Sequence, residues 1–252
     1  GANAWRTFDA WPPPGTPRSL WLGPDGRLVD QRVDLAPAPR RAFDQFVSDP
    51  ARPVPYSEAV STGMTREYMV DDQRFAARRP DVLVWSSEPL REPVTVAGPV
   101  VAELWVSTDR DDADWIVKLV DVLPDDAPDH AWVPEGRHMG GYQMMVRSEV
   151  LRGRYRDGYG APRPFTPGRP TRVRVPLQDV LHTFEAGHRI MIQVQSTWFP
   201  LVDRNPQRWV DSVYEAREED FVAATHRVYR DAQHPSRVEV TVIPTPAAPR
   251  GD

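Results

Sequence analysis

The sequence predicts an all-β protein, a mostly antiparallel jelly-roll-like β-sandwich, on three observations. Apolar and polar residues alternate with a period of two along several short runs, most clearly over 100–107 and 115–120. This alternation is typical of strands with one buried face. Glycine, proline and aspartate separate the runs, as turns between strands require. Only residues 215–224 have a helical pattern, so we expect at most short helices.

We divide the chain into four segments. Residues 1–30 form a strap rich in tryptophan and proline that ends in a first strand, since proline at this density opposes helix. Residues 31–66 are predicted to be a Pro-rich loop packed on the sandwich, residues 67–243 the sandwich, and residues 244–252 a frayed tail. Strands are expected at 19–22, 82–85, 94–97, 100–106, 115–120, 142–151, 171–176, 188–196, 225–229 and 237–243.

The composition excludes several classes of function. The chain has 252 residues and a formal net charge of −5, and its arginines are scattered, so nucleic acid is not an expected partner. No run of apolar residues approaches the roughly 20 that a membrane helix needs, so no membrane partner is expected. Cysteine is absent, which excludes disulfides, thiolate zinc sites and cysteine nucleophiles.

No strong catalytic motif is present. The Gly-x-Ser-x-Gly motif of a nucleophile elbow is absent. Ser196, Asp203 and His226 are a conceivable triad, because such residues can assemble from distant positions. A histidine on a strand is more often a hydrogen-bonded structural residue, and we favour that interpretation.

Four aspartates crowd the loop from Asp109 to Asp114. Loop carboxylates suit calcium, which prefers several hard oxygen ligands. The spacing lacks the glycine and the distal glutamate of an EF-hand loop, so a solvated turn in which Asp114 pins the start of a strand is the alternative. Histidines in a His-x-x-x-His pair are absent, and we predict no metal site and no cofactor.

The nine tryptophans suggest a second class of function, a free-standing carbohydrate-binding module. However, four of them lie on or beside predicted strands, where core packing is the simpler account. These four are Trp85, Trp105, Trp115 and Trp198.

Several segments together, in order along nearly the whole chain, resemble the C-terminal domain of the X-Pro dipeptidyl-peptidase, cocaine-esterase-like and α-amino-acid ester hydrolase family of serine hydrolases. The finer likeness is to the α-amino-acid ester hydrolases and glutaryl-acylase-like members. The segments that carry the resemblance are 1–6 with Trp11-Pro12, 107–108 with 114–125, 141–142 through 151–156, 187–200 with 203–206, 225–229 and 234–236.

The resemblance implies a galactose-binding-domain-like sandwich that follows an α/β-hydrolase domain carrying a Ser–Asp–His triad and a helical cap. All three triad residues would precede the position that matches Gly1, so no catalytic residue is assigned here and the chain alone is expected to be inactive. The expected partner is the α/β-hydrolase domain of the same polypeptide, which the sandwich would stabilise while walling its substrate cleft. Association of the isolated chain into a homo-oligomer is a second expectation, because the docking surface would be exposed.

The docking surface is predicted from large apolar residues that lie in proline-interrupted chain rather than on strands. In the docking role we place Trp5, Phe8, Trp11, Tyr56 and Met64. Tyr68 and Met69 are predicted to wall the substrate cleft. The alternative is that this loop folds back over the sandwich as a lid. Structural roles are assigned to His188, Arg189, Asp203, Arg204 and Asn205, the last three forming a turn held by ion pairs and side-chain-to-backbone bonds.

Overall fold

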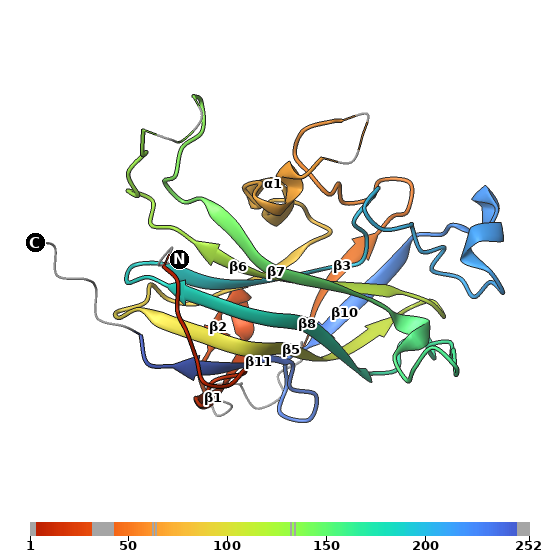
Figure 1. Cartoon of the computed structure of the whole chain (residues 1–252). Helices are drawn as coiled ribbons and strands as arrows, with labels where there is room; N and C mark the ends of the chain where they lie inside the picture. The colour runs from red at the N-terminus through yellow and green to blue at the C-terminus, as the bar shows by residue number, and fades with distance from the viewer. Residues whose placement is uncertain are drawn as a thin grey trace, which may run out of the picture.

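Two antiparallel β-sheets face each other across one apolar core (Figure 1). The computed structural model describes residues 4–31, 43–61, 63, 65–131, 133 and 135–245. Every strand pair within the two sheets is antiparallel. The α-helix α1 (Arg74–Ala77) has four residues, and the other helices within these residues are single 3-10 turns. The predicted all-β sandwich with at most short helices is therefore confirmed.

The larger sheet, sheet A, has seven strands. Its strand order is β2-β1-β11-β5-β10-β3, and β8 also pairs with β5. The strands of sheet A are β1 (Thr16–Leu22), β2 (Leu28–Val29), β3 (Phe43–Ser48), β5 (Val94–Thr108), β8 (Thr171–Phe184), β10 (Ala224–Tyr229) and β11 (Arg237–Ile243).

The smaller sheet, sheet B, has four strands in the order β4-β9-β6-β7. Successive residues of β6 face opposite sides of the sheet, as the pleat requires. Trp115, Val117 and Leu119 belong to the main core, whereas Ile116 belongs to a separate cluster. Sheet B is therefore covered on both faces. Its strands are β4 (Leu83–Ser86), β6 (Asp114–Val122), β7 (Gln143–Arg152) and β9 (Arg189–Gln195).

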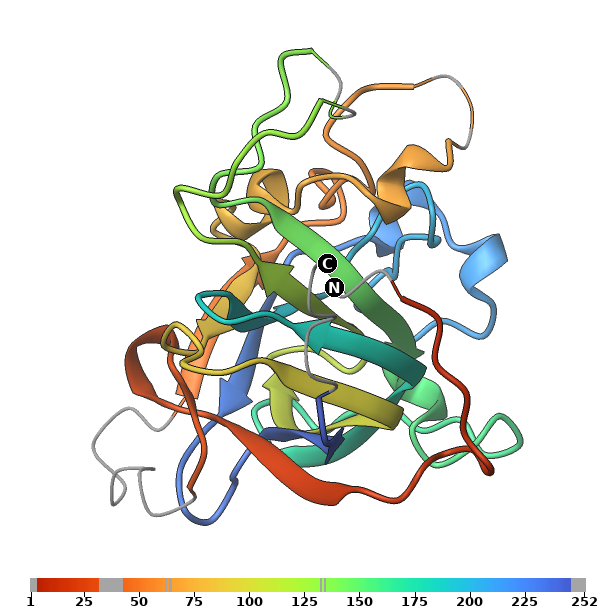
Figure 2. The same cartoon turned by 60° about the vertical axis from the view of Figure 1, so that its left-hand side comes forward.

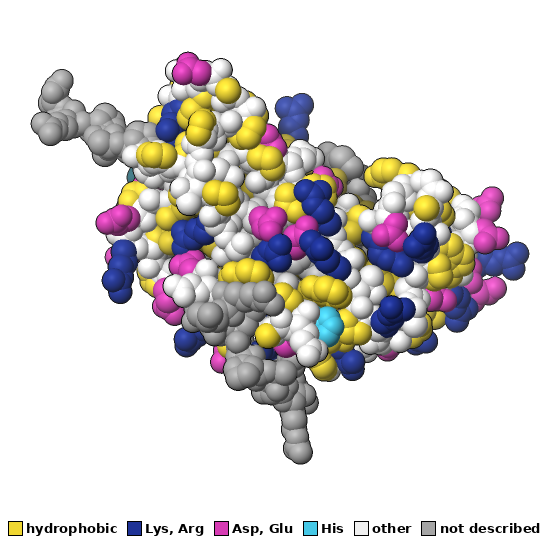
Figure 3. Space-filling model, turned by 90° about the horizontal axis from the view of Figure 1, so that it is seen from below, with side chains coloured by type: hydrophobic (Ala, Val, Ile, Leu, Met, Phe, Trp, Pro, Cys, Tyr) yellow, Lys and Arg dark blue, Asp and Glu magenta, His cyan; other side chains and the backbone are white. Residues whose placement is uncertain are grey.

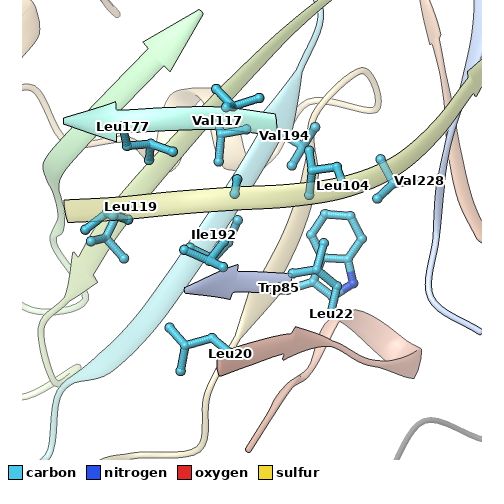
Figure 4. Close-up of a cluster of buried hydrophobic side chains, with 14 of the residues drawn as sticks. Leu20, Leu22, Trp85, Leu104, Val117, Leu119, Leu177, Ile192, Val194 and Val228 are labelled. Carbon is cyan, nitrogen blue, oxygen red and sulfur yellow. The ribbon is translucent and has the colours of Figure 1, made fainter. Parts of the chain in front are cut away.

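The main core lies between the sheets, and both contribute to it (Figure 4). Leu104 and Leu177 enter it from sheet A, and Trp85, Val117 and Ile192 from sheet B. Three of the four tryptophans weighed as sugar-binding residues, Trp85, Trp115 and Trp198, are buried. Trp105 is half-buried and packs edge-on against His234. Core packing therefore accounts for Trp85, Trp115 and Trp198, whereas Trp105 belongs to none of the core clusters.

The structure departs from the expected elements in three places. The segment 31–66, expected to be irregular, contains β3, which pairs with β10 and forms the edge of sheet A. The expected helix at 215–224 is replaced by two 3-10 turns, η5 (Val213–Glu215) and η6 (Glu218–Asp220). The runs 94–97 and 100–106 join into the single strand β5 through a bulge between Pro99 and Val101, which accommodates the proline. The remaining 3-10 turns are η1 (Pro24–Gly26), η3 (Glu67–Met69) and η4 (Gly153–Tyr155).

The outer surface of the sandwich is mixed in character. Seen from below in Figure 3, apolar side chains are interspersed with basic and acidic ones. None of the helices in the described part of the chain has the length and hydropathy of a transmembrane segment. The predicted tail 244–252 lies outside the described residues from 246 onwards.

Candidate functional site

One irregular segment covers the outer face of sheet B. We call residues 49–81 the outer-face segment; it lies above β6 and β7 in Figure 1. At its first half, Val54 donates its backbone N–H to Thr197 Oγ1 at 2.8 Å, and Tyr56 donates to the carbonyl of Phe199 at 3.0 Å. At its second half, Gln73 donates its backbone N–H to the carbonyl of Gln143 at 2.9 Å. These bonds join the segment to the loop after β9 and to the start of β7.

An aromatic cluster lies beneath this segment. The rings of Tyr56 and Tyr68 lie 5.5 Å apart, and Tyr68 meets Trp198 edge-on at 6.0 Å. Ile116 forms the floor of the cluster from β6. Tyr56, expected on a docking surface, is 4% exposed because its ring packs into this cluster within its own domain. At Tyr56 the chain packs back onto the sandwich.

The rim of the same segment stays open to solvent. Met69 is 48% exposed and the neighbouring Val70 is also exposed, whereas Tyr68 is partly buried between the rim and the cluster. The predicted cleft-wall residues Tyr68 and Met69 therefore adjoin an apolar rim that is held from below by buried aromatic rings. Met64 lies outside the described residues.

A cleft of about 410 Å³ opens beside this rim, between the outer-face segment and the loop before β7. Its walls are charged: Asp72 pairs with Arg74, and Arg137 lies 3.8 Å from Asp71. Tyr142 closes one side, and its hydroxyl donates to the carbonyl of Val70. The charged cleft and the apolar rim together form a surface of mixed character on the sheet B side of the molecule.

The strap lies on another part of the molecule and leads into β1 (Figure 2). Trp5 is fully exposed, and Trp11 is 48% exposed although its Nε1–H donates to Asp179 Oδ2 at 2.5 Å. Phe8 is partly buried and lies 6.0 Å from the Trp11 ring. Pro12 approaches Gly98 so closely that a Cβ there would lie 2.7 Å from Pro12 Cβ, and Gly98 has a φ of 91°. Glycine at this position lets the strap lie against β5.

The conceivable triad is not assembled. His226 is fully buried, and its Nε2 lies 2.6 Å from Gln207 Oε1. Burial lowers the pKa of His226 to about 3, so the imidazole is neutral at physiological pH. Ser196 is buried whereas Asp203 is exposed. His226 is therefore a core residue, packed between the rings of Phe46 and Trp115.

The aspartates of the 109–114 loop bind protein groups. Asp112 pairs with Arg154 at 2.6 Å, and both side chains are buried. Asp114 pairs with Arg152 at 3.3 Å and accepts a 2.7 Å hydrogen bond from Asn205 Nδ2. Burial raises the pKa of Asp114 to about 6. The two buried aspartates, Asp112 and Asp114, are thus engaged by arginine and asparagine side chains at the start of β6, whereas Asp109 is exposed.

The five residues assigned structural roles all make polar contacts within the domain. Asn205 also accepts the backbone N–H of Gln207 at 2.7 Å, and Arg204 donates to the carbonyl of Pro50 at 2.9 Å, which links the turn to the outer-face segment. The carbonyl of Asp203 accepts from Arg152 at 3.2 Å. His188 and His182 contact the two oxygens of buried Asp121 at 2.8 and 2.9 Å, and Arg189 donates to the carbonyl of Ser87 at 2.9 Å.

The sequence assigned no role to Lys118 of β6 or to Gln73 of the outer-face segment, and both side chains are fully buried. Their side chains meet at 2.9 Å. The signal for Lys118 was present, since it is the single lysine of the chain and stands in the middle of a strand run. Nothing in the local pattern marks Gln73, because its partner is 45 residues away.

Comparison with known proteins gives one consistent match. Residues 1–239 match the family described as X-Pro dipeptidyl-peptidase C-terminal non-catalytic domain. A cocaine esterase of Rhodococcus sp. (strain MB1 Bresler) is 31% identical over 248 residues, which are 96% of this chain and 40% of the esterase. The crystal structure of an aminopeptidase from a marine sediment Thaumarchaeota archaeon is 46% identical, with a TM-score of 0.86, and the match covers 97% of this chain and 39% of the aminopeptidase.

A structure of an α-amino acid ester hydrolase is also similar, with 38% identity and a TM-score of 0.85. That match covers 96% of this chain and 40% of the ester hydrolase. The chain thus spans about two fifths of the relatives it matches.

Proposed function

The chain belongs to the family of X-Pro dipeptidyl-peptidase C-terminal non-catalytic domains, and from that premise we propose that it stabilises an α/β-hydrolase domain of the same polypeptide and walls that domain's substrate cleft. The parent protein would be a serine hydrolase that cleaves esters or amides. The catalytic domain would determine which substrate the parent protein cleaves, and the present domain does not identify that substrate.

The observation that carries the proposal is the exposure of large apolar side chains in segments that have their own rigid support. Trp5 and Trp11 are exposed on the strap, although Trp11 is held by Asp179. Met69 and Val70 are exposed on the outer-face segment, although Tyr68 beside them packs into the aromatic cluster. Exposed apolar groups on a fixed support are typical of surfaces that another protein or domain covers.

The two surfaces suit different tasks. The strap lies at the amino-terminal end of the described chain, where a preceding domain would be connected, so Trp5, Phe8 and Trp11 are proposed to dock against it. The outer-face segment combines an apolar rim with a charged cleft, and we assign Tyr68 and Met69 to the substrate-cleft wall. A wall of this kind fixes the position of a substrate and excludes water from the reacting groups.

Kinetics of the whole gene product test the wall. We expect Tyr68→Ala and Met69→Ala each to lower kcat/KM by about tenfold for at least one aminoacyl ester or aminoacyl anilide, since loss of positioning contacts costs on the order of 1–2 kcal/mol in the transition state. The matched control is Tyr159→Ala, which removes an exposed tyrosine from a loop outside both surfaces and should leave kcat/KM unchanged.

Two results would contradict the proposal. One is unchanged kcat/KM for both variants across a panel of ester, anilide and dipeptidyl substrates, with the fold shown intact by circular dichroism. The other is turnover of these substrates by the chain on its own, which would place chemistry in this domain.

A further inference from the structure

Lys118 is a fully buried basic residue that has no acidic partner among the residues that the structure describes. It lies in the middle of β6 on the outer face of sheet B, and its side chain has no exposed surface. The residues paired with it on the two neighbouring strands are neutral, Ser148 on β7 and Gln193 on β9. Burial lowers the pKa of Lys118 to about 7, with no contribution from another charged group. A charge in this position is costly, so its contacts need a physical account.

Two contacts direct Lys118 toward the outer-face segment. Its Nζ donates to Gln73 Oε1 at 2.9 Å and lies 4.7 Å from the centre of the Trp198 ring. An ammonium over an indole ring is a favourable arrangement, and it is stronger when both are removed from water. Gln73 comes directly before α1 in the segment, and Trp198 comes from the loop after β9.

Both contacts connect Lys118 to the neighbourhood of the residues proposed to wall the cleft. Gln73 donates its Nε2–H to the carbonyl of Asp71 at 2.8 Å and its backbone N–H to Gln143, so its side chain and main chain are both fixed. Trp198 packs edge-on against Tyr68 at 6.0 Å. Lys118 is therefore linked to the segment on both sides of Met69. On one side it bonds to Gln73 directly, and on the other it contacts Trp198, which packs against Tyr68.

We propose that Lys118 is a positioning residue that fixes the outer-face segment in one place on sheet B, and that it thereby sets the position of Tyr68 and Met69. An apolar side chain would fill the same space at lower cost, but it would favour no particular placement of the segment. A directional hydrogen bond to one glutamine and an ammonium over one ring specify a single arrangement. Only the consequence for the cleft rests on the function proposed above.

Hydrogen exchange of the chain tests the positioning step without any enzyme activity. In Lys118→Met, we expect the backbone N–H groups of Tyr56 and Gln73, which bond to Phe199 and Gln143, to exchange at least about tenfold faster. Exchange in β6 and β9 should stay slow, because the sheet itself is intact. Gln73→Leu in the Lys118→Met background should add only the effect of losing the Gln73–Asp71 hydrogen bond, because the bond between the two side chains is already lost.

The matched control is Ile116→Met, two residues away on the same face of β6 and in contact with the same aromatic cluster. It repacks the cluster but leaves the Lys118–Gln73 hydrogen bond, so exchange at Gln73 should stay within about twofold of the original chain. Should Lys118→Met fail to fold, Gln73→Met serves as the second variant. It removes the same bond from the other side, together with the Gln73–Asp71 bond, keeps the Lys118–Trp198 contact, and should also speed exchange at Gln73.

The outcomes separate the inference from the proposed function. Unchanged exchange at Tyr56 and Gln73 in Lys118→Met, or equal acceleration in Ile116→Met, overturns the positioning role whatever the kinetics show. Faster exchange in Lys118→Met, with unchanged kcat/KM of the whole gene product, supports the positioning role and counts against the cleft wall. Faster exchange together with lower kcat/KM supports both.

Discussion

The two faces of sheet B are both buried, but they are buried in different ways. The inner face packs Trp115, Val117 and Leu119 against sheet A, and this contact is mainly apolar, with the neutral ring of His226 against Trp115. The outer face is covered by an irregular segment that is held by hydrogen bonds and by the side chain of Lys118. Apolar packing tolerates changes in detail as long as volume is kept, whereas a polar contact favours one geometry. We infer that packing at the inner face stabilises the fold and that the contacts at the outer face fix the position of the outer-face segment.

The largest effect is expected at the inner face. Trp115→Ala should lower the free energy of unfolding by about 4 kcal/mol, because it leaves a large cavity in a core that has no solvent access. Trp105→Ala, at a half-buried site against His234, should cost only about 1 kcal/mol. Urea unfolding followed by far-UV circular dichroism measures both. Equal losses would contradict the placement of the main core between the two sheets, because Trp115 faces that core from sheet B whereas Trp105, on β5 of sheet A, lies outside it.

The pH dependence of stability should show the same division between the faces. His226 faces the main core and has a pKa lowered to about 3, whereas the unfolded chain binds a proton at this group below about pH 6.5. Protonation thus favours unfolding, so His226 lowers stability as the pH falls from about 6.5 toward about 3, with a slope of at most about 1.4 kcal/mol per pH unit. His226→Gln should flatten this acid limb.

Lys118 affects the opposite limb. Its pKa is lowered to about 7 in the folded chain, whereas the unfolded lysine stays protonated up to about pH 10.5. Between these values the unfolded state binds more protons, so stability should rise with pH from about 7 to about 10. Lys118→Met should remove that rise and leave the acid limb unchanged. Urea midpoints across the two pH ranges measure both variants, and identical pH profiles for Lys118→Met and the original chain would show that Lys118 is solvated.

The same division explains how much of the molecule was predictable from the sequence. The strands of the inner core follow from local alternation, and Trp85 and Trp115 were placed correctly because each lies in such a run. The strand β3 was missed because it is short and stands inside a Pro-rich stretch, where its pairing with β10 depends on a strand about 180 residues away. Local pattern carries no information about a pairing of that separation.

The outer-face segment was less predictable for the same reason. Its position depends on polar contacts between residues that are distant in sequence, such as Lys118 with Gln73 and Arg204 with Pro50. Composition alone suggested that Tyr56, Tyr68 and Met69 share one exposed surface. The structure instead buries Tyr56, partly buries Tyr68 and leaves Met69 exposed to solvent.

The smallest effect on stability is expected at the strap, where the effect on association should be the largest. Trp5 is fully exposed and makes no core contact, so Trp5→Ser should change the free energy of unfolding by less than about 0.5 kcal/mol. If the strap is a docking surface, the isolated chain should self-associate through it, because a large exposed aromatic group favours a covering partner. Sedimentation velocity over a range of protein concentrations measures this, and Trp5→Ser should shift the chain toward monomer.

Tyr159→Ala is the matched control, since it removes another exposed aromatic side chain from a different loop and should leave the sedimentation profile unchanged. Equal loss of self-association in both variants would show that any exposed ring suffices and that the strap has no special part in docking. A monomeric original chain at every concentration would argue that the strap alone is too weak to hold a partner. The docking energy would then have to come from the outer-face rim, where Met69→Ser in the whole gene product is the corresponding test.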